Sequence, residues 1–144
     1  MRISTVIAGK GAFVATIRPT ASVTELLEEL AHYGIGALVV SSDGVGIEGI
    51  VSERDVVRHL QRLGPGLLEQ PVAAIMTAVV LTCGPSDEVD SVMSTMTTRR
   101  VRHLPVVSGG ALVGIVSIGD VVKSRVSELE LERETLVNYI TTGR

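Results

Sequence analysis

The stretch GIVSERDVV at residues 49–57 is repeated as GIVSIGDVV at residues 114–122. Each copy contains Gly, two β-branched apolar residues, Ser, two variable residues, Asp and two valines. A serine that follows an apolar run and precedes an acid by three residues is typical of a helix start. The recurrence therefore predicts that one strand-to-helix unit occurs twice in the chain.

The composition limits the class of protein. The chain has 144 residues, 45% of them hydrophobic, and no apolar run near the roughly 20 residues of a membrane span, so we expect a soluble protein. Cys83 is the single cysteine and residues 1–13 lack the long apolar stretch of a secretory signal, so we expect a cytoplasmic location. The net charge of −3 and the three aromatic residues argue against nucleic-acid binding.

Hydrophobic periodicity and turn residues predict the same order of elements in both halves. After a helical turn at residues 2–9, the first half is predicted to have strands at 13–17, 37–40 and 47–51 and helices at 22–33 and 53–63. After a short helical piece at residues 72–76, the second half is predicted to have strands at 79–82, 104–107 and 112–116 and helices at 87–99 and about 119–140. Each predicted unit is thus strand, helix, strand, strand, helix.

A sheet of this size cannot cover both of its faces alone. We therefore predict an α/β (α+β) fold in which two β-α-β-β-α repeats pack sheet to sheet around one shared core, with pseudo-two-fold symmetry. The predicted domains are repeat 1 at residues 6–66, repeat 2 at 72–128, and a C-terminal helical extension at 129–144.

The motifs GIVSERD (49–55), RHLPVV (102–107) and GIVSIGD (114–120), in two tandem copies of this order of elements, resemble a pair of CBS domains, also called a Bateman module. The resemblance covers roughly residues 6–125. The whole length is similar to the short stand-alone CBS-pair proteins of bacteria. The resemblance implies a non-enzymatic, cytosolic regulatory module that binds AMP, ADP, ATP or S-adenosylmethionine in clefts between the repeats and often dimerises.

The repeated serine and aspartate have two interpretations. Ser52 and Ser117 can cap the helices that follow, with Asp55 and Asp120 placed to favour the helix dipole. Alternatively, the free N–H groups of a helix start attract phosphate, and a carboxylate one turn later can accept hydrogen bonds from two ribose hydroxyls. The resemblance implies the second role, with serine at the phosphate or ribose and aspartate at the ribose. Both interpretations can hold together.

The adenine ring of such a ligand needs a flat apolar slot with backbone hydrogen bonds. The resemblance implies that the slots are lined by strand ends, namely Thr16, Ile17, Ala37 and Leu38 from repeat 1 and Thr82, Cys83, His103, Leu104 and Pro105 from repeat 2. For the leucines, a place in the ordinary core is the stronger interpretation. The two threonines favour ligand contact, because each is polar at a matched position just before a turn.

The repeats differ in charge. Repeat 2 carries Arg99, Arg100, Arg102 and His103 at the positions where repeat 1 has Tyr33, Gly34, Gly36 and Ala37. Conversely, Arg54 in the first motif corresponds to Gly119 in the second. Cations are common at a solvated helix end, but here they directly precede a cleft-lining strand, which favours phosphate contact equally. We therefore predict unequal clefts, with a phosphorylated ligand drawn to Arg102 and His103. The sequence leaves open which aspartate serves that cleft.

No arrangement typical of catalysis or metal binding is evident. The three histidines are not spaced as a helical metal pair, Cys83 has no neighbouring base, and the glycine-rich stretches match no nucleotide-binding fingerprint. We therefore predict a protein that is not an enzyme and has no catalytic cofactor or metal. The alternative to a ligand-binding module is a dimeric interaction scaffold whose clefts are vestigial.

The last predicted helix is longer than the motif requires. Its apolar residues alternate at spacings of four and three, with Arg133 interrupting a stripe formed by Val122, Val126, Leu129, Leu136 and Ile140. Such a helix can fold back on its own core or pack against a second chain. Its length favours a homodimer. The sequence identifies no protein partner, and it predicts contact with neither nucleic acid nor membrane.

Overall fold

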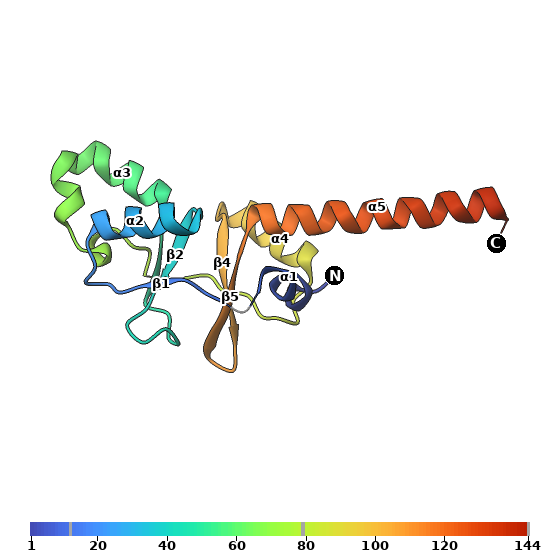
Figure 1. Cartoon of the computed structure of the whole chain (residues 1–144), viewed down its shortest axis with the longest axis horizontal. Coiled ribbons are helices and arrows are strands. Elements are labelled where there is room, and N and C mark those ends of the chain that lie inside the picture. Colours follow the sequence, from blue (N-terminus) through green and yellow to red (C-terminus); the bar gives the residue numbers. More distant parts are fainter. Residues whose placement is uncertain (12, 79, 144) are drawn as a thin grey trace.

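The computed structural model describes residues 1–11, 13–78 and 80–143, which form two lobes side by side with a long helix projecting from the second (Figure 1). The repeat-1 lobe contains β1 (Thr16–Ile17), α2 (Val23–Tyr33), β2 (Ala37–Val40), β3 (Gly49–Ser52) and α3 (Glu53–Leu63). The repeat-2 lobe contains α4 (Val89–Arg99), β4 (His103–Ser108), β5 (Ala111–Ser117) and α5 (Ile118–Thr142). The remaining elements are α1 (Ile3–Lys10) and two 3₁₀ helices, η1 (Gly64–Glu69) and η2 (Val72–Ala74). The mixed α/β class and the long final helix agree with the prediction.

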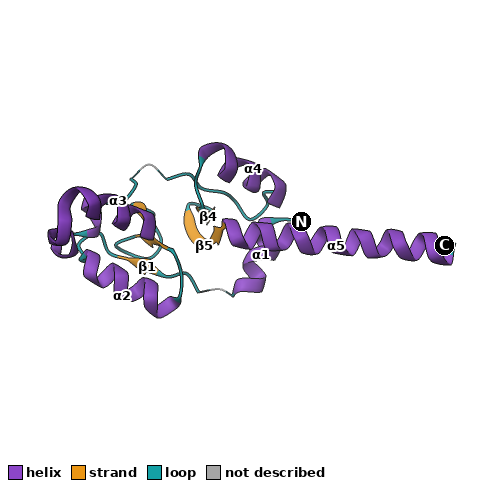
Figure 2. Cartoon of the chain, turned by 90° about the horizontal axis from the view of Figure 1, so that it is seen from above, coloured by secondary structure: helices purple, strands orange, loops and turns teal. Residues whose placement is uncertain are grey.

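The last two predicted strands of each repeat are present and form an antiparallel hairpin. In the repeat-1 lobe β2 pairs antiparallel with β3, placing Leu38 opposite Val51, and β1 adds in parallel along β2. In the repeat-2 lobe β4 pairs antiparallel with β5, with Leu104 opposite Val116. The strands of both lobes lie toward the middle of the molecule, with α2, α3 and α4 outside them (Figure 2).

The strand predicted at residues 79–82 is wrong over residues 80–82. Val79 lies outside the described residues, and residues 80–82 are not in a strand. Instead, the chain meets β4 at Cys83 alone, through a parallel bridge to Val106 in which Cys83 N–H donates to Pro105 O at 3.0 Å. Val80 and Leu81 line the cleft between the lobes, so their contacts are with that space rather than with a neighbouring strand. The strand predicted at 13–17 is likewise reduced to β1.

The buried apolar residues form two clusters, so the prediction of one shared core is wrong. The repeat-1 cluster is completed by Leu67, Val72 and Ile75 from the segment that follows α3. The repeat-2 cluster is completed by Ile3 and Val6 of α1, which precedes the first repeat in sequence. Each small sheet is therefore covered by a helical segment from outside its own β-α-β-β-α unit. The two lobes do not need each other's sheets to bury their apolar faces.

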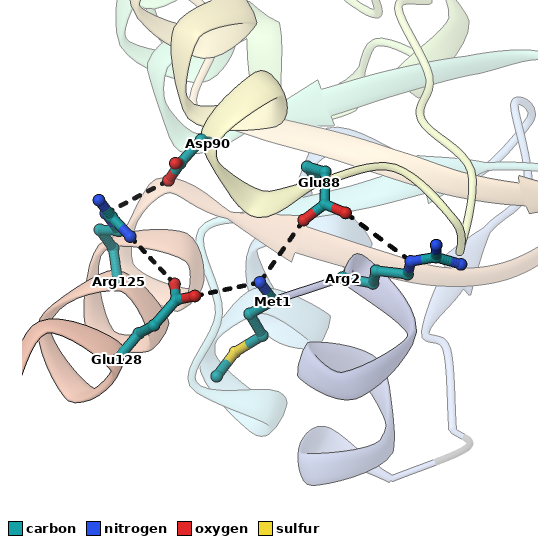
Figure 3. A network of polar contacts seen from close by, with 6 residues as sticks. All are labelled: Met1, Arg2, Glu88, Asp90, Arg125 and Glu128. Atoms are coloured by element: carbon teal, nitrogen blue, oxygen red, sulfur yellow. Dashed lines mark hydrogen bonds and ion pairs between the residues drawn. The ribbon is translucent and has the colours of Figure 1, made fainter. Parts of the chain in front are cut away.

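Polar contacts hold the N-terminus, just before α1, against the repeat-2 lobe (Figure 3). The Met1 amino group lies 3.2 Å from Glu128 Oε1 of α5 and 3.5 Å from Glu88 Oε2 before α4. Arg125 of α5 contacts Glu128 at 3.2 Å and Asp90 of α4 at 3.3 Å. Ion pairs this exposed each stabilise by at most about 1 kcal/mol, so the buried side chains of α1 supply most of its attachment.

The helix starts follow the expected capping chemistry. Ser22 and Glu25 form a reciprocal capping box, with the Glu25 N–H donating to Ser22 Oγ at 3.1 Å and the Ser22 N–H donating to Glu25 Oε2 at 3.0 Å. Ser117 and Asp120 repeat this arrangement at α5. The capping interpretation of the repeated motif is therefore confirmed for Ser117, whereas at Ser52 the contacts to Asp55 Oδ2 come from the serine N–H and hydroxyl. It leaves the ligand interpretation open, because capping uses only part of each side chain.

Candidate functional site: a cleft between the repeats

A cleft of about 520 Å³ lies between the lobes and takes its walls from both of them. Cavities of roughly 300–1,000 Å³ are the usual size for small-molecule sites. The walls come from the starts of β2 and α3, from β3, from the linker after η2, from the approach to β4 and its first residues, and from the start of α5. The lining residues are Gly36, Ala37, Ile50, Ser52, Glu53, Arg54, Asp55, Arg58, Thr77, Val80, Leu81, Arg100, Val101, Arg102, His103, Leu104, Ile118 and Gly119.

The cleft brings together seven of the residues singled out from the sequence, namely Ala37, Ser52, Arg54, Asp55, Arg102, His103 and Leu104. These seven come from both repeats. Arg102 and His103 of repeat 2 thus line the same space as Asp55 of repeat 1. The sequence left open which aspartate shares a cleft with Arg102 and His103, and in the structure it is Asp55.

The other predicted site residues lie elsewhere. Outside the lining of this cleft are Thr16, Ile17, Leu38, Thr82, Cys83, Pro105, Ser117 and Asp120. Ile17, Leu38 and Cys83 are core residues, and Leu38 is fully buried, as the core interpretation of the leucines expects. Burial also raises the pKa of the Cys83 thiol to about 11, so it stays protonated and unreactive near neutral pH. Thr82 is exposed and Thr16 is partly buried.

The charge of the cleft is predominantly positive. Its four arginines, Arg54, Arg58, Arg100 and Arg102, outnumber the two carboxylates, Glu53 and Asp55. Two of the arginines lie one helical turn apart on α3 and two flank Val101 on the facing lobe. An anionic ligand would therefore be approached by guanidinium groups from opposite sides.

His103 adds an uncharged polar group to this wall. Burial lowers its pKa from the ordinary value of 6.5, and the positive charges of Arg102 and Lys10 lower it further, against smaller opposing effects of Asp120 and Glu53. The imidazole is therefore mainly neutral at physiological pH, when it can donate one hydrogen bond and accept another. His103 also lies close to the opposite lobe, because a Cβ on Gly36 would stand 3.6 Å from its Cε1 atom.

Asp55 is held at the start of α3 with part of its carboxylate already used. Its Oδ2 atom accepts from the Ser52 N–H at 2.8 Å and lies 3.2 Å from the Ser52 hydroxyl. One turn later, the carbonyl of Asp55 lies 2.7 Å from Nδ1 of His59. These contacts fix the side chain at the cleft wall. Among the described residues, the Oδ1 atom of Asp55 takes no part in these bonds.

Arg100 enters the cleft wall from a strained backbone. Its φ is +54°, and among the non-glycine residues that the structure describes it alone has a positive φ. The corresponding C-cap of α2 is Gly34, at φ +63° and ψ +38°, nearly the same left-handed conformation. Glycine adopts this conformation without a steric penalty, whereas other residues pay about 1 kcal/mol or more. The backbone conformation at this position favours glycine. The presence of arginine is therefore better explained by the place of its side chain in the cleft wall.

Several cleft residues were not among the predicted site residues. Arg58 follows Arg54 by one helical turn, so the helical period of α3 could have indicated that both reach one surface. Arg100 belongs to the basic cluster noted in the sequence but was not selected from it. Thr77, Val80 and Leu81 come from the linker. Nothing in the linker's composition marks it as a wall of a site.

The part of the chain that the structure describes was searched for a metal site and for a membrane-spanning helix. Among residues 1–11, 13–78 and 80–143, no three His, Cys, Asp or Glu side chains stand close enough to hold a metal ion. In the same part of the chain, every helix is too short or too polar to cross a bilayer.

Fold and cleft together define a tandem α/β repeat module with a small-molecule cleft between its repeats. The family model of the CBS domain matches residues 13–62 and 72–127, more than half of the chain. The chain therefore belongs to the CBS-domain family, as its doubled motif predicted.

Proteins of the same family resemble it over most of its length. The CBS-domain containing protein ATU1752 from Agrobacterium tumefaciens is 40% identical with a TM-score of 0.83, covering 87% of this chain and 99% of its own. The CBS domain protein PAE2072 from Pyrobaculum aerophilum, solved in complex with AMP, is 31% identical with a TM-score of 0.78, covering 92% of this chain and 99% of its own.

A third relative is the mitochondrial CBS domain-containing protein CBSX3 of Arabidopsis thaliana, 35% identical over 126 residues and 85% of this chain. The chain spans only 61% of the length of that curated relative. A mitochondrial protein among its relatives means that family membership does not fix a compartment. The cytoplasmic location inferred from the sequence stays a prediction.

Proposed function

We propose that this protein is a regulatory module that binds an adenosine-containing ligand in the cleft between its repeats. The observation that carries the proposal is the meeting of Asp55, at the start of α3, with Arg100 and Arg102 of the other repeat in one space. A carboxylate suits the hydroxyls of a ribose and guanidinium groups suit phosphate. AMP bound to PAE2072, a relative 31% identical in sequence, supports this choice of ligand class.

Each part of such a ligand has a counterpart in the cleft. The free Oδ1 of Asp55 accepts from the ribose hydroxyls, and the four arginines contact the phosphate from both lobes. Ala37, Ile50, Val80 and Leu81 supply apolar surface for the adenine ring. The neutral imidazole of His103 is a further hydrogen-bonding group on the facing wall.

The regulatory effect follows from the position of the ligand between two separately packed lobes. Each lobe has its own apolar cluster, so a change in the angle between lobes need not open a core. A ligand that contacts both lobes binds best to one arrangement of them and shifts the population toward it. A protein partner that contacts both lobes would sense that shift.

Thermal unfolding tests the proposal. AMP, ATP and S-adenosylmethionine are each added at millimolar concentration, and a ligand that binds the native state raises the melting temperature. Replacing Arg102 with Ala removes a charge-assisted contact and should weaken binding about tenfold. The matched control is Arg18→Ala, because Arg18 is exposed outside the cleft and the same charge is lost. Equal effects of the two substitutions in calorimetry would contradict the assignment of the cleft.

A dimeric scaffold is the second candidate, and α5 is the observation that favours it. The exposed fractions of Leu129, Leu136 and Ile140 are 47%, 61% and 78%, although they share one stripe of the helix. An antiparallel pair of such helices, centred on residue 131, would place Leu129 opposite Arg133 of the second copy. A parallel pair would instead bring the two Arg133 side chains together. We therefore infer that the two copies pack antiparallel.

Truncation separates this candidate from the first. Without residues 129–144 the chain keeps the described cleft but loses most of the exposed stripe. Light scattering should then report a monomer, while the effect of AMP on the melting temperature persists. If none of the three ligands shifts the melting temperature and the truncated chain is monomeric, the scaffold is the better description. If the truncated chain remains a dimer, α5 is not the main contact between copies.

A further inference from the structure

His103 lies in the cleft wall at the point where the two lobes come close together. It is the first residue of β4 and pairs with Ser117 of β5, so its backbone is fixed in the repeat-2 sheet. A Cβ on Gly36 of the repeat-1 lobe would stand 3.6 Å from Cε1 of His103 and 3.3 Å from Oε1 of Glu53. The imidazole therefore lies against the facing lobe while it lines the cleft.

The ring nitrogens of this imidazole are open to the cleft. Within the described residues, the ring of His59 bonds to the Asp55 carbonyl, whereas no hydrogen bond involves the ring of His103. In the same part of the chain, no buried side-chain nitrogen lacks a partner, so the nitrogens of His103 are reachable from outside the protein. An anion in the cleft can therefore accept a hydrogen bond from this ring.

Charges of both signs face His103 from each neighbouring element. The cations are Arg102, directly before it, and Lys10 of α1, and the carboxylates are Asp120 of α5 and Glu53 of α3. Lys10 and Asp120 are bonded to each other at 2.7 Å, so their opposite effects partly offset. Burial and the cations together lower the pKa of the imidazole from its ordinary value of 6.5. The other charged residues of the cleft are Arg54, Asp55, Arg58 and Arg100.

A phosphate group bound in the cleft would reverse this balance. Arg100 and Arg102, the groups proposed to contact phosphate, belong to the same wall as His103. An opposite charge within about 4–6 Å of a titrating group favours its charged form and changes its pKa by about 1 to 3. A protonated imidazole would also donate a charge-assisted hydrogen bond to the phosphate, which is stronger than the bond from a neutral ring.

We propose that His103 links nucleotide binding to proton uptake: its ring is neutral in the free protein and takes up one proton from solvent when the phosphate binds. This inference rests on the proposed function and adds the regulation of the same cleft. Because the complex has the higher pKa, affinity rises as pH falls through the pKa of the complex. The gain is complete below the lowered pKa of the free protein. Occupancy of the cleft at a fixed nucleotide concentration thus depends on pH.

Calorimetric titration with AMP from about pH 8 to about pH 6, around the reference pKa of histidine, tests the inference. A phosphate monoester itself titrates near about pH 6, so affinities are compared between variants with the same ligand. The wild type should gain about fivefold in affinity relative to His103→Gln over this range, since glutamine forms hydrogen bonds but does not titrate. His32→Gln is the matched control, because His32 is exposed on α2 outside the cleft. It should follow the wild type.

Two further measurements separate the phosphate from other causes. With adenosine, which lacks the phosphate, the ratio of wild-type to His103→Gln affinity should not change with pH. NMR titration of the wild type needs no variant, and AMP should raise the pKa of one of the three imidazoles by about one.

The outcomes distinguish this inference from the proposed function. The inference alone is overturned by a pH-independent affinity ratio with AMP, by a pH-dependent ratio with adenosine, or by imidazole pKa values that saturating AMP leaves unchanged. Absence of AMP binding by the wild type at every pH would overturn the proposed function as well.

Discussion

The two repeats of this protein share a motif and a fold but differ in what surrounds the motif. In repeat 1, Asp55 lines a cleft with Arg100 and Arg102 from the other lobe. In repeat 2, Asp120 is paired with Lys10 of α1. The motif therefore begins a helix with a serine and an aspartate twice, whereas residues outside the motif give each copy different neighbours. Functional difference between the repeats is to be sought in those outer residues.

The largest expected effect concerns the two aspartates themselves. Asp55→Ala removes the acceptor of two ribose hydrogen bonds and should weaken AMP binding about 100-fold or more, since each bond to a charged group stabilises by about 1.5–3 kcal/mol. Asp120→Ala should change AMP affinity by less than about threefold, because Asp120 lies outside the lining of the cleft. Calorimetry on both variants measures the contrast. Similar losses of affinity would show that the repeats are equivalent in binding.

The next effect concerns stability at the first residue of each motif. A Cβ on Gly49 would stand 2.7 Å from Met76 Sδ and 2.9 Å from the backbone carbonyl of Thr77. The corresponding Cβ on Gly114 would stand 3.2 Å from Cδ1 of Ile7, a side-chain atom that can move. We expect Gly49→Ala to lower the free energy of unfolding by about 2 kcal/mol and Gly114→Ala by about 1 kcal/mol or less. Urea denaturation monitored by circular dichroism provides both values, and a larger loss for Gly114→Ala would contradict this account.

A third effect separates stability from binding at the equivalent C-caps of α2 and α4. Arg100→Gly relieves the left-handed strain and should raise the free energy of unfolding by about 0.5–1 kcal/mol, while it weakens AMP binding several-fold by removing a guanidinium. Gly34→Ala should do the reverse for stability, with a loss of about 1 kcal/mol and little change in affinity. Thermal melting with and without AMP measures both quantities. A gain in stability without loss of affinity would show that Arg100 does not contact the ligand.

Much of this fold could be predicted from local pattern. The helix starts after Ser22, Ser52 and Ser117 and the two hairpins depend on residues near each other in sequence, and all of them are present. The single shared core was wrong, because which segment covers a small sheet is a long-range choice. The strand at residues 80–82 was wrong for a similar reason: an apolar run suits a cleft wall as well as a sheet.

As with the fold, only the local features of the candidate site could be predicted from the sequence. The doubled Ser and Asp and the basic residues before β4 are visible in the sequence, and seven of the selected residues line one cleft. Their pairing across the lobes depends on how the lobes dock, which no local pattern encodes. Lys10 illustrates the limit, since it lies 110 residues from Asp120 in the chain and nothing in its neighbours marks it.

The smallest expected effect is a pH dependence that comes from repeat 2. Because burial lowers the pKa of His103 in the folded state, the unfolded chain takes up a proton more readily as pH falls through the ordinary value of 6.5. Stability should therefore be unaffected by His103 above that value and decline below it. Arg102 and Lys10 face the imidazole and strengthen this trend, whereas Asp120 and Glu53 oppose it.

Comparison with repeat 1 provides the control for that measurement. Ala37 occupies the position of His103 in repeat 1, so His103→Ala makes the two repeats alike at this position without adding a new polar group. Melting temperatures of the wild type and of His103→Ala are compared between pH 7.5 and about 5.5, a range chosen around the reference pKa of histidine. The wild type should lose more stability over this range than the variant. Parallel curves would mean that His103 takes up its proton as easily in the folded protein as in the unfolded chain, and that the wall of the cleft is more hydrated than its burial indicates.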